Sequence, residues 1–135
     1  REQYISTNMQ NRQVDSFLYV CGGYGAKKVL LDTLWVTHNI ISRININQIV
    51  KAILAKDSIG IRKAIAYDKN DFLKATGGEL YKMPDGKFYL LVGHNFKGRY
   101  ADTNKLSLNY AVQTYLDAVH VFSLIENSYK RYIGY

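Results

Sequence analysis

Hydrophobic residues in this chain occur in short runs separated by polar residues, and two of these runs are nearly repeated. FLYVCGGYG occupies residues 17–25, and FYLLVGHNF occupies residues 88–96. Each is an aromatic and β-branched run that ends on glycine, as expected of a strand that stops where a side chain would obstruct a neighbouring backbone. The repetition predicts two similar structural units.

A second pair of similar runs follows the first pair. DTLWVTH (residues 32–38) and DAVHVFSL (residues 117–124) both open with Asp and then alternate large and polar side chains, as a strand with one buried face does. We expect these strands to be equivalent, which gives His38 and His120 analogous places. YGAKKVLL, before the first of them, predicts a short loop or hairpin that connects this strand to the preceding FLYVCGG strand as its antiparallel neighbour. The longer interval before the second predicts an expanded loop.

Between the two units, apolar residues recur at helical spacing. The segment INQIVKAILAKD, residues 46–57, has Ile, Val and Leu at intervals of three and four residues. It predicts an amphipathic helix that is capped by Asn45 or Asn47 and packs its apolar stripe on a sheet edge.

The following residues predict further strands, IRKAIAYD (61–68) and FLKATGGELYKM (72–83). Pro-Asp-Gly then supplies a turn that closes a hairpin, because Pro presets φ and Gly accepts the positive φ that follows. TGGELYKM and KFYLLVG should therefore lie side by side and antiparallel. With DAVHVFSL and the terminal KRYIGY they would make four strands.

Repeated units of four short antiparallel strands, with glycine pairs at strand ends, are typical of β-propeller blades. We expect an all-β fold in which residues 1–135 form one propeller segment: blade one at about 17–68, with the helix insert 46–57, and blade two at about 72–135. Blades take about 40 to 50 residues and closed propellers contain about four to eight. The chain is therefore expected to be one part of a larger propeller and not a closed ring on its own.

The same residues carry a family resemblance. YVCGGYG followed by DTLWV, and TGGELYKM, PDG and KFYLLVGHNFKGRY followed by YLDAVHVFSL, resemble kelch-type propeller repeats, in particular the kelch-like proteins of Bacteroidetes-type bacteria. The resemblance covers roughly residues 17–125 and includes an Asn-Phe-x-Gly-x-Tyr element that begins at Asn95. Val92-Gly93-His94 departs from the usual glycine pair. The resemblance implies a cell-envelope or exported bacterial protein.

Composition and charge restrict the possible partners. The chain has 135 residues, a net charge of +7 and 12 Tyr, but its Lys and Arg fall in scattered pairs, so we expect a solvated surface and no nucleic-acid partner. No apolar run reaches the roughly 18 residues of a membrane span. The single cysteine, Cys21, lies in an apolar run, which favours core packing over nucleophilic chemistry.

The most suggestive polar cluster is GHNFKGRY, which supplies four candidate ligand-binding residues: His94, Asn95, Arg99 and Tyr100. Such a cluster on a propeller loop is suited to a sugar or a carboxylate. In the alternative interpretation, Asn95 and Arg99 brace the loop through hydrogen bonds to backbone carbonyls. The three histidines lack ligand spacing, so we expect no metal and no cofactor.

No catalytic residues can be assigned from the sequence. We therefore expect a non-enzymatic binding or protein-interaction module with a protein or glycan partner, completed by other blades or subunits. The first alternative is a sugar-processing enzyme on a kelch propeller whose other catalytic residues lie outside this chain. The second is a structural subunit whose open blade edges pair with another chain.

Overall fold

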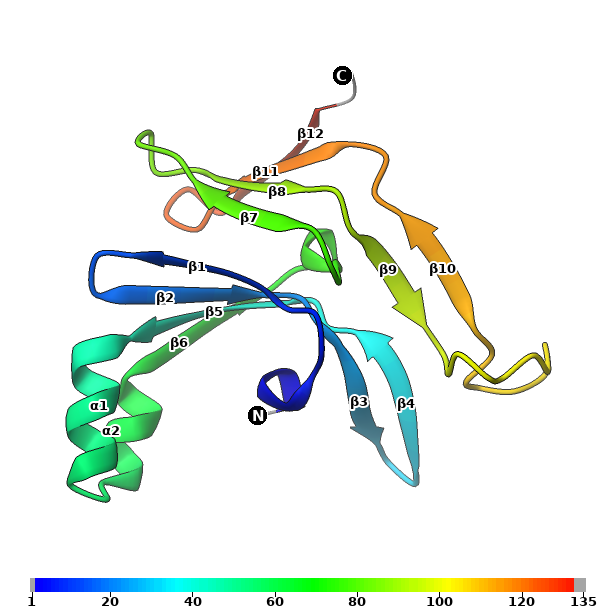
Figure 1. Cartoon of the computed structure of the whole chain (residues 1–135), viewed down its shortest axis with the longest axis horizontal. Coiled ribbons are helices and arrows are strands. Elements are labelled where there is room, and N and C mark those ends of the chain that lie inside the picture. The colour runs from blue at the N-terminus through cyan, green and yellow to red at the C-terminus, as the bar shows by residue number, and fades with distance from the viewer. Residues whose placement is uncertain (1, 133–135) are drawn as a thin grey trace.

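The computed structural model describes residues 2–132, and these residues form mostly β-structure (Figure 1). The strands of the first half are β1 (Gln10–Val14), β2 (Phe17–Cys21), β3 (Tyr24–Val29), β4 (Asp32–Thr37), β5 (Ile40–Asn45) and β6 (Ile65–Lys69). Those of the second half are β7 (Glu79–Lys82), β8 (Phe88–Leu91), β9 (His94–Lys97), β10 (Val112–Tyr115), β11 (Val119–Ser123) and β12 (Ser128–Tyr132). The helices are α1 (Ile46–Leu54) and α2 (Ser58–Lys63), with the 3-10 turns η1 (Glu2–Ile5) and η2 (Asp71–Leu73).

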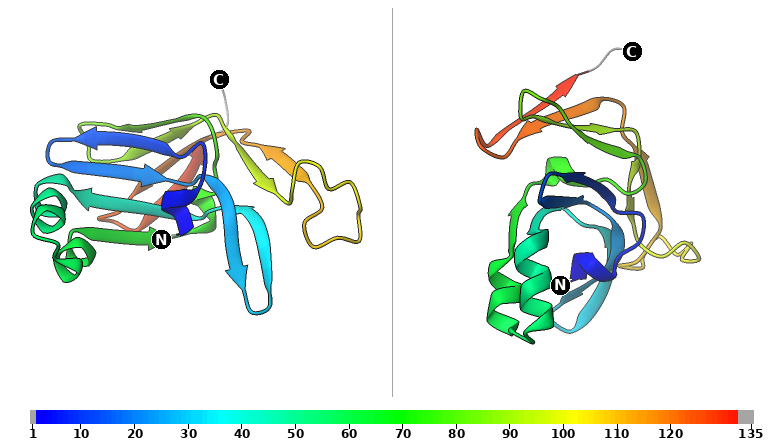
Figure 2. Two further views of the ribbon diagram at one scale, coloured as in Figure 1. Left: turned by 60° about the horizontal axis from the view of Figure 1, so that its bottom comes forward. Right: turned by 60° about the vertical axis from the view of Figure 1, so that its left-hand side comes forward.

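The strands make three antiparallel sheets of four strands each. We call β1-β2-β5-β6 the first sheet, β7-β8-β11-β12 the second sheet, and β10-β9-β4-β3 the arm sheet. None of these sheets closes on itself within the described part of the chain. The first and second sheets are stacked, and the arm sheet extends away from both (Figures 1 and 2).

Each half of the chain is built around a long hairpin that bends at glycine. In the first half, β2 continues into β3 and β4 continues into β5, and the ladder runs through the bend because the Gly22 N–H donates to the Ile40 carbonyl (2.9 Å) and the His38 N–H donates to the Gly23 carbonyl (2.8 Å). In the second half, the Leu116 N–H donates to the Gly93 carbonyl (3.1 Å) in the same way. The ends of the two bent hairpins lie side by side and form the arm sheet.

The two halves are equivalent units, matched by their hydrogen-bond registers. The isolated bridge Thr7↔Tyr24 corresponds to Thr76↔His94. Within the sheets, the pair Val20↔Ser42 corresponds to Leu90↔His120. The 3-10 turns η1 and η2 precede the two bridges at the same interval. We call residues 2–69 unit one and residues 71–132 unit two.

The core lies between the first and second sheets. Its buried side chains come from both units: Tyr19, Cys21 and Ile41 from unit one, and Leu73, Ala75, Leu80, Phe88, Leu90 and Phe122 from unit two. The rings of Tyr19 and Phe88 meet edge to face with centroids 4.7 Å apart. Neither unit buries this apolar surface without the other.

Several strand predictions are confirmed, and others are wrong. The second sheet contains strands at the four expected places, with Tyr81 opposite Tyr89 across the Pro-Asp-Gly hairpin. The last of them is β12, and residues 133–135 of the expected KRYIGY lie outside the described residues. Residues 24–29 form strand β3, and β2 pairs with β5 and not with the DTLWV strand. The equivalence of DTLWVTH and DAVHVFSL is therefore wrong, because β4 corresponds to β10, and His120 corresponds to Ser42 and not to His38.

The helical region also differs from expectation. Asn45, one of the two predicted caps, caps α1 by accepting a hydrogen bond from the Gln48 N–H. The helix ends at Leu54, three residues before the predicted end at residue 57. Residues 61–63, expected to begin the strand 61–68, instead end the second helix α2, which Asp57 caps by accepting from the Ile59 and Gly60 N–H groups. The rest of the expected strand is present as β6. Two helices therefore replace the single insert.

The apolar stripe of α1 does not pack on a sheet edge as predicted. Ala52 is its only buried residue. Val50, Ile53 and Leu54 are exposed by 48%, 55% and 79%. The helical hairpin thus presents an apolar surface to the outside.

The sequence pattern did not predict strand β1, which forms one edge of the first sheet. Strand β1, QNRQV, pairs with β2 along its whole length and holds its single apolar residue, Val14, opposite Phe17. Residues 72–83, expected to form a strand interrupted by the pair Gly77 and Gly78, contain the end of η2 and a bridge at Thr76 before the glycine pair, and β7 after it. None of the helices formed by residues 2–132 is long and apolar enough to cross a membrane.

Candidate functional site

The four predicted site residues lie at and just beyond β9, where the second bent hairpin enters the arm sheet. His94 and Asn95 are in β9 and point to opposite faces of the sheet, because side chains alternate along a strand. Arg99 and Tyr100 belong to the loop after β9 and are exposed. The structure therefore brings Arg99 and Tyr100 together and places the side chains of His94 and Asn95 apart from each other.

Tyr100 belongs to an aromatic cluster in the arm sheet. Its ring stacks on Phe96 with centroids 4.2 Å apart, and it meets Tyr24 edge to face at 5.8 Å. Tyr24 and Phe96 are buried, whereas Tyr100 is 67% exposed. The inner rings thus hold the Tyr100 ring in place while its outer face stays open to solvent.

The inner part of this cluster is fixed by backbone contacts. The Tyr24 hydroxyl donates to the Gly98 carbonyl (2.6 Å), and the Gly98 N–H donates to the Trp35 carbonyl (2.7 Å). Burial is the main cause that raises the pKa of the Tyr24 hydroxyl, so this group stays protonated and keeps donating at neutral pH. A Cβ on Gly98 would lie 2.1 Å from the Tyr110 carbonyl oxygen, which makes glycine necessary for the close approach of the two loop ends.

Arg99 lies over the indole of Trp35, with its guanidinium carbon 5.8 Å from the ring centroid. This distance is within the range of a cation–π contact. The Trp35 Nε1 is buried and has no hydrogen-bond partner among the described residues. We call the surface formed by Trp35, Arg99 and Tyr100 the arm platform.

The loop that carries the platform is braced by residues other than those proposed from the sequence. Asn109 accepts from the Trp35 N–H (3.0 Å) and donates to the Thr33 carbonyl (3.1 Å), which ties the loop to β4. The carboxylate of Asp102 accepts from the Ser107 hydroxyl and from the Asn104 N–H. The described part of the chain shows no side-chain hydrogen bond from Asn95 or Arg99 to a backbone carbonyl.

Asn95 instead lines a smaller pocket of about 450 Å³ beside the second sheet. His120 lies in this pocket, donates from Nδ1 to the Phe72 carbonyl (2.9 Å) and stacks on the Phe72 ring at 4.0 Å. Asp117 pairs with Arg131 at the rim, and the hydrogen bond from Arg131 is the main cause that lowers the pKa of Asp117. The polar groups of this pocket are therefore mostly engaged with one another.

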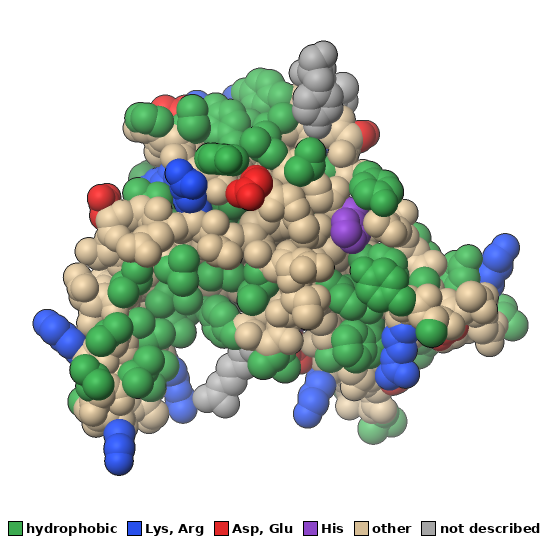
Figure 3. Space-filling model, viewed as in Figure 1, with side chains coloured by type: hydrophobic (Ala, Val, Ile, Leu, Met, Phe, Trp, Pro, Cys, Tyr) green, Lys and Arg blue, Asp and Glu red, His purple; other side chains and the backbone are tan. Residues whose placement is uncertain are grey.

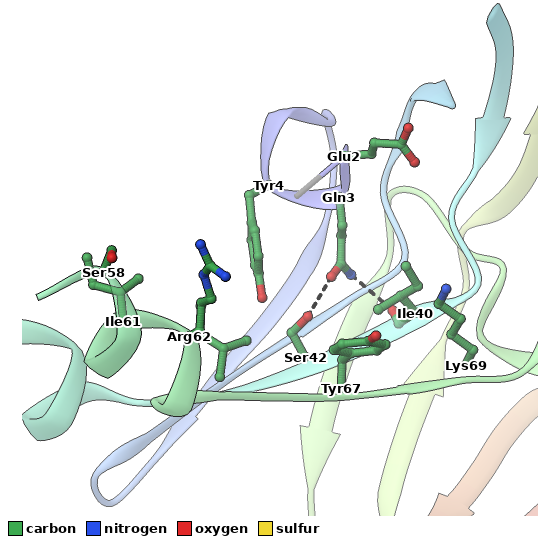
Figure 4. Close-up of a pocket in the computed structure, with 11 residues that line it drawn as sticks. Glu2, Gln3, Tyr4, Ile40, Ser42, Ser58, Ile61, Arg62, Tyr67 and Lys69 are labelled. Carbon is green, nitrogen blue, oxygen red and sulfur yellow. Dashed lines mark hydrogen bonds between the residues drawn. The ribbon is translucent and has the colours of Figure 1, made fainter. Parts of the chain in front are cut away.

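A larger hollow, of about 820 Å³, lies on the outer side of the first sheet (Figure 4). It opens between η1, helix α2 and strands β5 and β6, and hydrophobic side chains border it (Figure 3). Tyr4, Tyr67, Arg62 and Lys69 line its walls.

Gln3 forms the floor of this hollow and is 2% exposed. Its Nε2 donates to the Val20, Gly22 and Ile40 carbonyls at 3.0 to 3.2 Å. Its Oε1 accepts from the Ser42 hydroxyl at 2.7 Å. Since both ends of the amide are engaged, Gln3 holds the bend of the first hairpin and leaves no free polar group for a ligand.

The single thiol of the chain is part of the hydrophobic core. Cys21 is fully buried in the core, and burial raises its pKa to about 12. A thiol with such a pKa supplies almost no thiolate at neutral pH and is a poor nucleophile. Within residues 2–132, no three His, Cys, Asp or Glu side chains gather closely enough to hold a metal ion.

No protein-family model matches the sequence, and no curated protein matches it either. The site therefore has to be argued from its own geometry. Sequence reasoning missed Tyr24 and Trp35 as members of the platform cluster. A signal existed for both, because Tyr24 follows the first glycine pair directly and Trp35 is the single tryptophan.

Proposed function

We propose that the chain is a non-enzymatic binding module built on kelch-like propeller blades, and that the arm platform contacts its ligand. The observation that carries the proposal is the exposed Tyr100 ring, stacked on buried Phe96 beside the Arg99 guanidinium. An aromatic face held rigidly beside a cation loses little entropy when a ligand settles on it. This is the combination that recurs at binding hot spots.

The kelch-like part of the proposal is supported by the two equivalent units. In each, a four-stranded meander is interrupted after its second strand by a glycine-bent hairpin. The first strands, β1 and β7, lie next to each other, as the inner strands of neighbouring blades would around a common axis. On this proposal, other blades or subunits complete the propeller.

The partner is proposed to be a glycan or a protein, and the protein is proposed to act in the cell envelope or outside the cell. The platform suits sugars because the C–H groups of a pyranose pack on an aromatic face, while a guanidinium donates to hydroxyl or carboxylate oxygens. Exposed tyrosine and arginine also suit a protein surface. The location is proposed from the kelch resemblance.

The test is binding of the full chain to a panel of neutral and acidic glycans, followed by titration of the best ligand. Tyr100→Ala and Arg99→Ala should each weaken binding about tenfold, which corresponds to about 1.4 kcal/mol. Leu106→Ala, at a 95% exposed position in the same loop, serves as the matched control and should leave the affinity unchanged.

Two results would contradict this assignment. If both platform variants bind as tightly as the parent while all melting temperatures agree, the platform is not the ligand site. If the isolated chain converts a glycan to a product, the result supports the alternative of a sugar-processing enzyme, and the non-enzymatic proposal fails.

A further inference from the structure

The packing between the two units joins two different faces. Unit one contributes the side of its sheet that carries Tyr19, Cys21 and Ile41, which we call the leading face. Unit two contributes the side that carries Leu80, Phe88, Leu90 and Phe122, which we call the trailing face.

Register equivalence shows that these faces are opposite sides of the same repeat. Because Val20 corresponds to Leu90 and Ser42 corresponds to His120, the counterparts of the trailing face in unit one are Asn11, Leu18, Val20 and Ile44. By the same registers, the counterparts of the leading face in unit two are Tyr89, Leu91 and Val119. The contact is therefore head-to-tail, which leaves one trailing face and one leading face without a neighbouring unit among residues 2–132.

Both outer faces keep the apolar chemistry of the packed ones. Tyr89 repeats the tyrosine that packs on Phe88, and Leu18 repeats Phe88 as a large apolar residue. Asn11 is the single polar replacement among the seven counterparts.

Side chains on the outer trailing face are more exposed to solvent than their counterparts in the packed contact. Leu73 of η2 is fully buried against unit one, whereas its counterpart in η1, Tyr4, is 38% exposed. The 820 Å³ hollow lies on this same face, and Tyr67 at its edge is 62% exposed. Ile61 of helix α2 lines one wall of the hollow and adds a further apolar side chain to this surface.

We propose that a second copy of this chain occupies the hollow, with the leading face of its unit two on the trailing face of unit one. The inference rests on the proposed function in one respect, since it treats the units as blades that stack around an axis. A second copy is the occupant because the chain already contains one example of the contact, made by residues with the same positions and the same chemistry. Repeated head-to-tail contacts of this kind close into a ring when the rotation permits.

The experiment measures the mass of the full chain in solution by sedimentation equilibrium and native mass spectrometry. The parent chain of 15.5 kDa should form assemblies of two or more copies, with the fraction assembled rising with concentration. Tyr67→Asp on the trailing face and Tyr89→Asp on the leading face should each give monomers, because each removes an aromatic ring from the contact and would bury a charge in its place. Tyr115→Asp, at a 70% exposed position in the arm sheet, is the matched control and should assemble like the parent.

Mixing the two variants provides the decisive measurement. Tyr67→Asp retains an intact leading face and Tyr89→Asp retains an intact trailing face, so an equimolar mixture should give one-to-one dimers and nothing larger. Circular dichroism of each variant checks folding. If Tyr89→Asp unfolds, Tyr132→Asp replaces it, because Tyr132 lies opposite Val119 on the same face and is 55% exposed.

The proposal is overturned if the parent chain stays monomeric at the highest concentration, or if two folded variants fail to pair in the mixture. It is also overturned if the native polypeptide proves longer and further units of that polypeptide cover the hollow. A monomer that still binds a glycan through Tyr100 would remove this inference and leave the proposed function intact.

Discussion

Gly22 illustrates how a single missing side chain allows the two units to meet. Its φ is +63°, and a Cβ at this position would lie 1.9 Å from the Ala75 carbonyl oxygen of unit two. Gly77 has nearly the same φ, +64°, but an added Cβ there would meet nothing within 4 Å. An added side chain at Gly77 would therefore cause backbone strain alone, whereas one at Gly22 would cause the same strain and a steric clash.

Gly77→Ala should lower the free energy of unfolding by about 1 kcal/mol, the cost of a left-handed backbone for a residue with a Cβ. Gly22→Ala should lower it by more than about 3 kcal/mol, because the unit-two backbone must also move away. Urea denaturation of both variants measures the difference. Equal losses would mean that the contact with Ala75 contributes nothing beyond strain.

At the scale of elements, the bent hairpins are joined by few backbone contacts. β4 and β9 share a single register pair, Val36↔Lys97. Thr37 reinforces this junction, because its hydroxyl donates to the Phe96 carbonyl (2.9 Å) and accepts from the Phe96 N–H (2.8 Å). One buried side chain thus replaces two hydrogen bonds of a backbone ladder.

Thr37→Val keeps the shape of this side chain and removes both hydrogen bonds. We expect a loss of about 1 to 3 kcal/mol in the free energy of unfolding, because the Phe96 N–H is left buried without a partner. Hydrogen exchange should show faster exchange of the Phe96 amide. Thr114→Val, at an exposed position in β10, is the control, and an equal effect of both variants would contradict the role of Thr37.

The elements that the sequence predicts correctly are those set by local chemistry. The Pro-Asp-Gly hairpin and the aromatic runs of β2 and β8 depend on neighbouring residues alone. Strand β1 was missed because QNRQV has no alternating apolar pattern and is held by pairing with β2. The second half of helix α2, residues 61–63, was predicted as the start of a strand because the apolar run IRKAIAYD outweighed the capping signal of Asp57.

The candidate site was predictable only in part for a related reason. The sequence shows which polar residues cluster along the chain, but strand alternation separates His94 from Asn95, and long-range pairing brings Tyr24 and Trp35 to Tyr100. These two residues lie more than sixty positions from Tyr100. The resemblance to kelch repeats stays a prediction, because two equivalent units with glycine-bent hairpins show a repeat without identifying its family.

At the scale of the whole molecule, a buried histidine links pH to stability. His38 is 4% exposed and its Nε2 has no hydrogen-bond partner among the described residues. Burial is the main cause that lowers its pKa from the ordinary value. As the pH falls, the unfolded chain therefore takes up the proton first, and the folded state loses stability between about pH 7 and pH 5.

His38→Leu should reduce this loss, because Leu116 occupies the corresponding place in unit two and shows that the position accepts leucine. Thermal unfolding at pH 8, 7, 6 and 5 measures the effect. The difference in melting temperature between variant and parent should be constant above pH 7 and grow in favour of the variant below it. Parallel curves over the whole range would assign the pH dependence to other groups.

Gln3 and Ser42 have counterparts of unrelated chemistry in the other unit, where Phe72 stacks on His120. The same structural position is thus filled by an amide–hydroxyl pair in unit one and by a stacked ring–imidazole pair in unit two. Recombining the repeats, or averaging them into a consensus for protein design, must exchange both partners together, because a mixed pair would leave either a stranded amide or an unstacked ring.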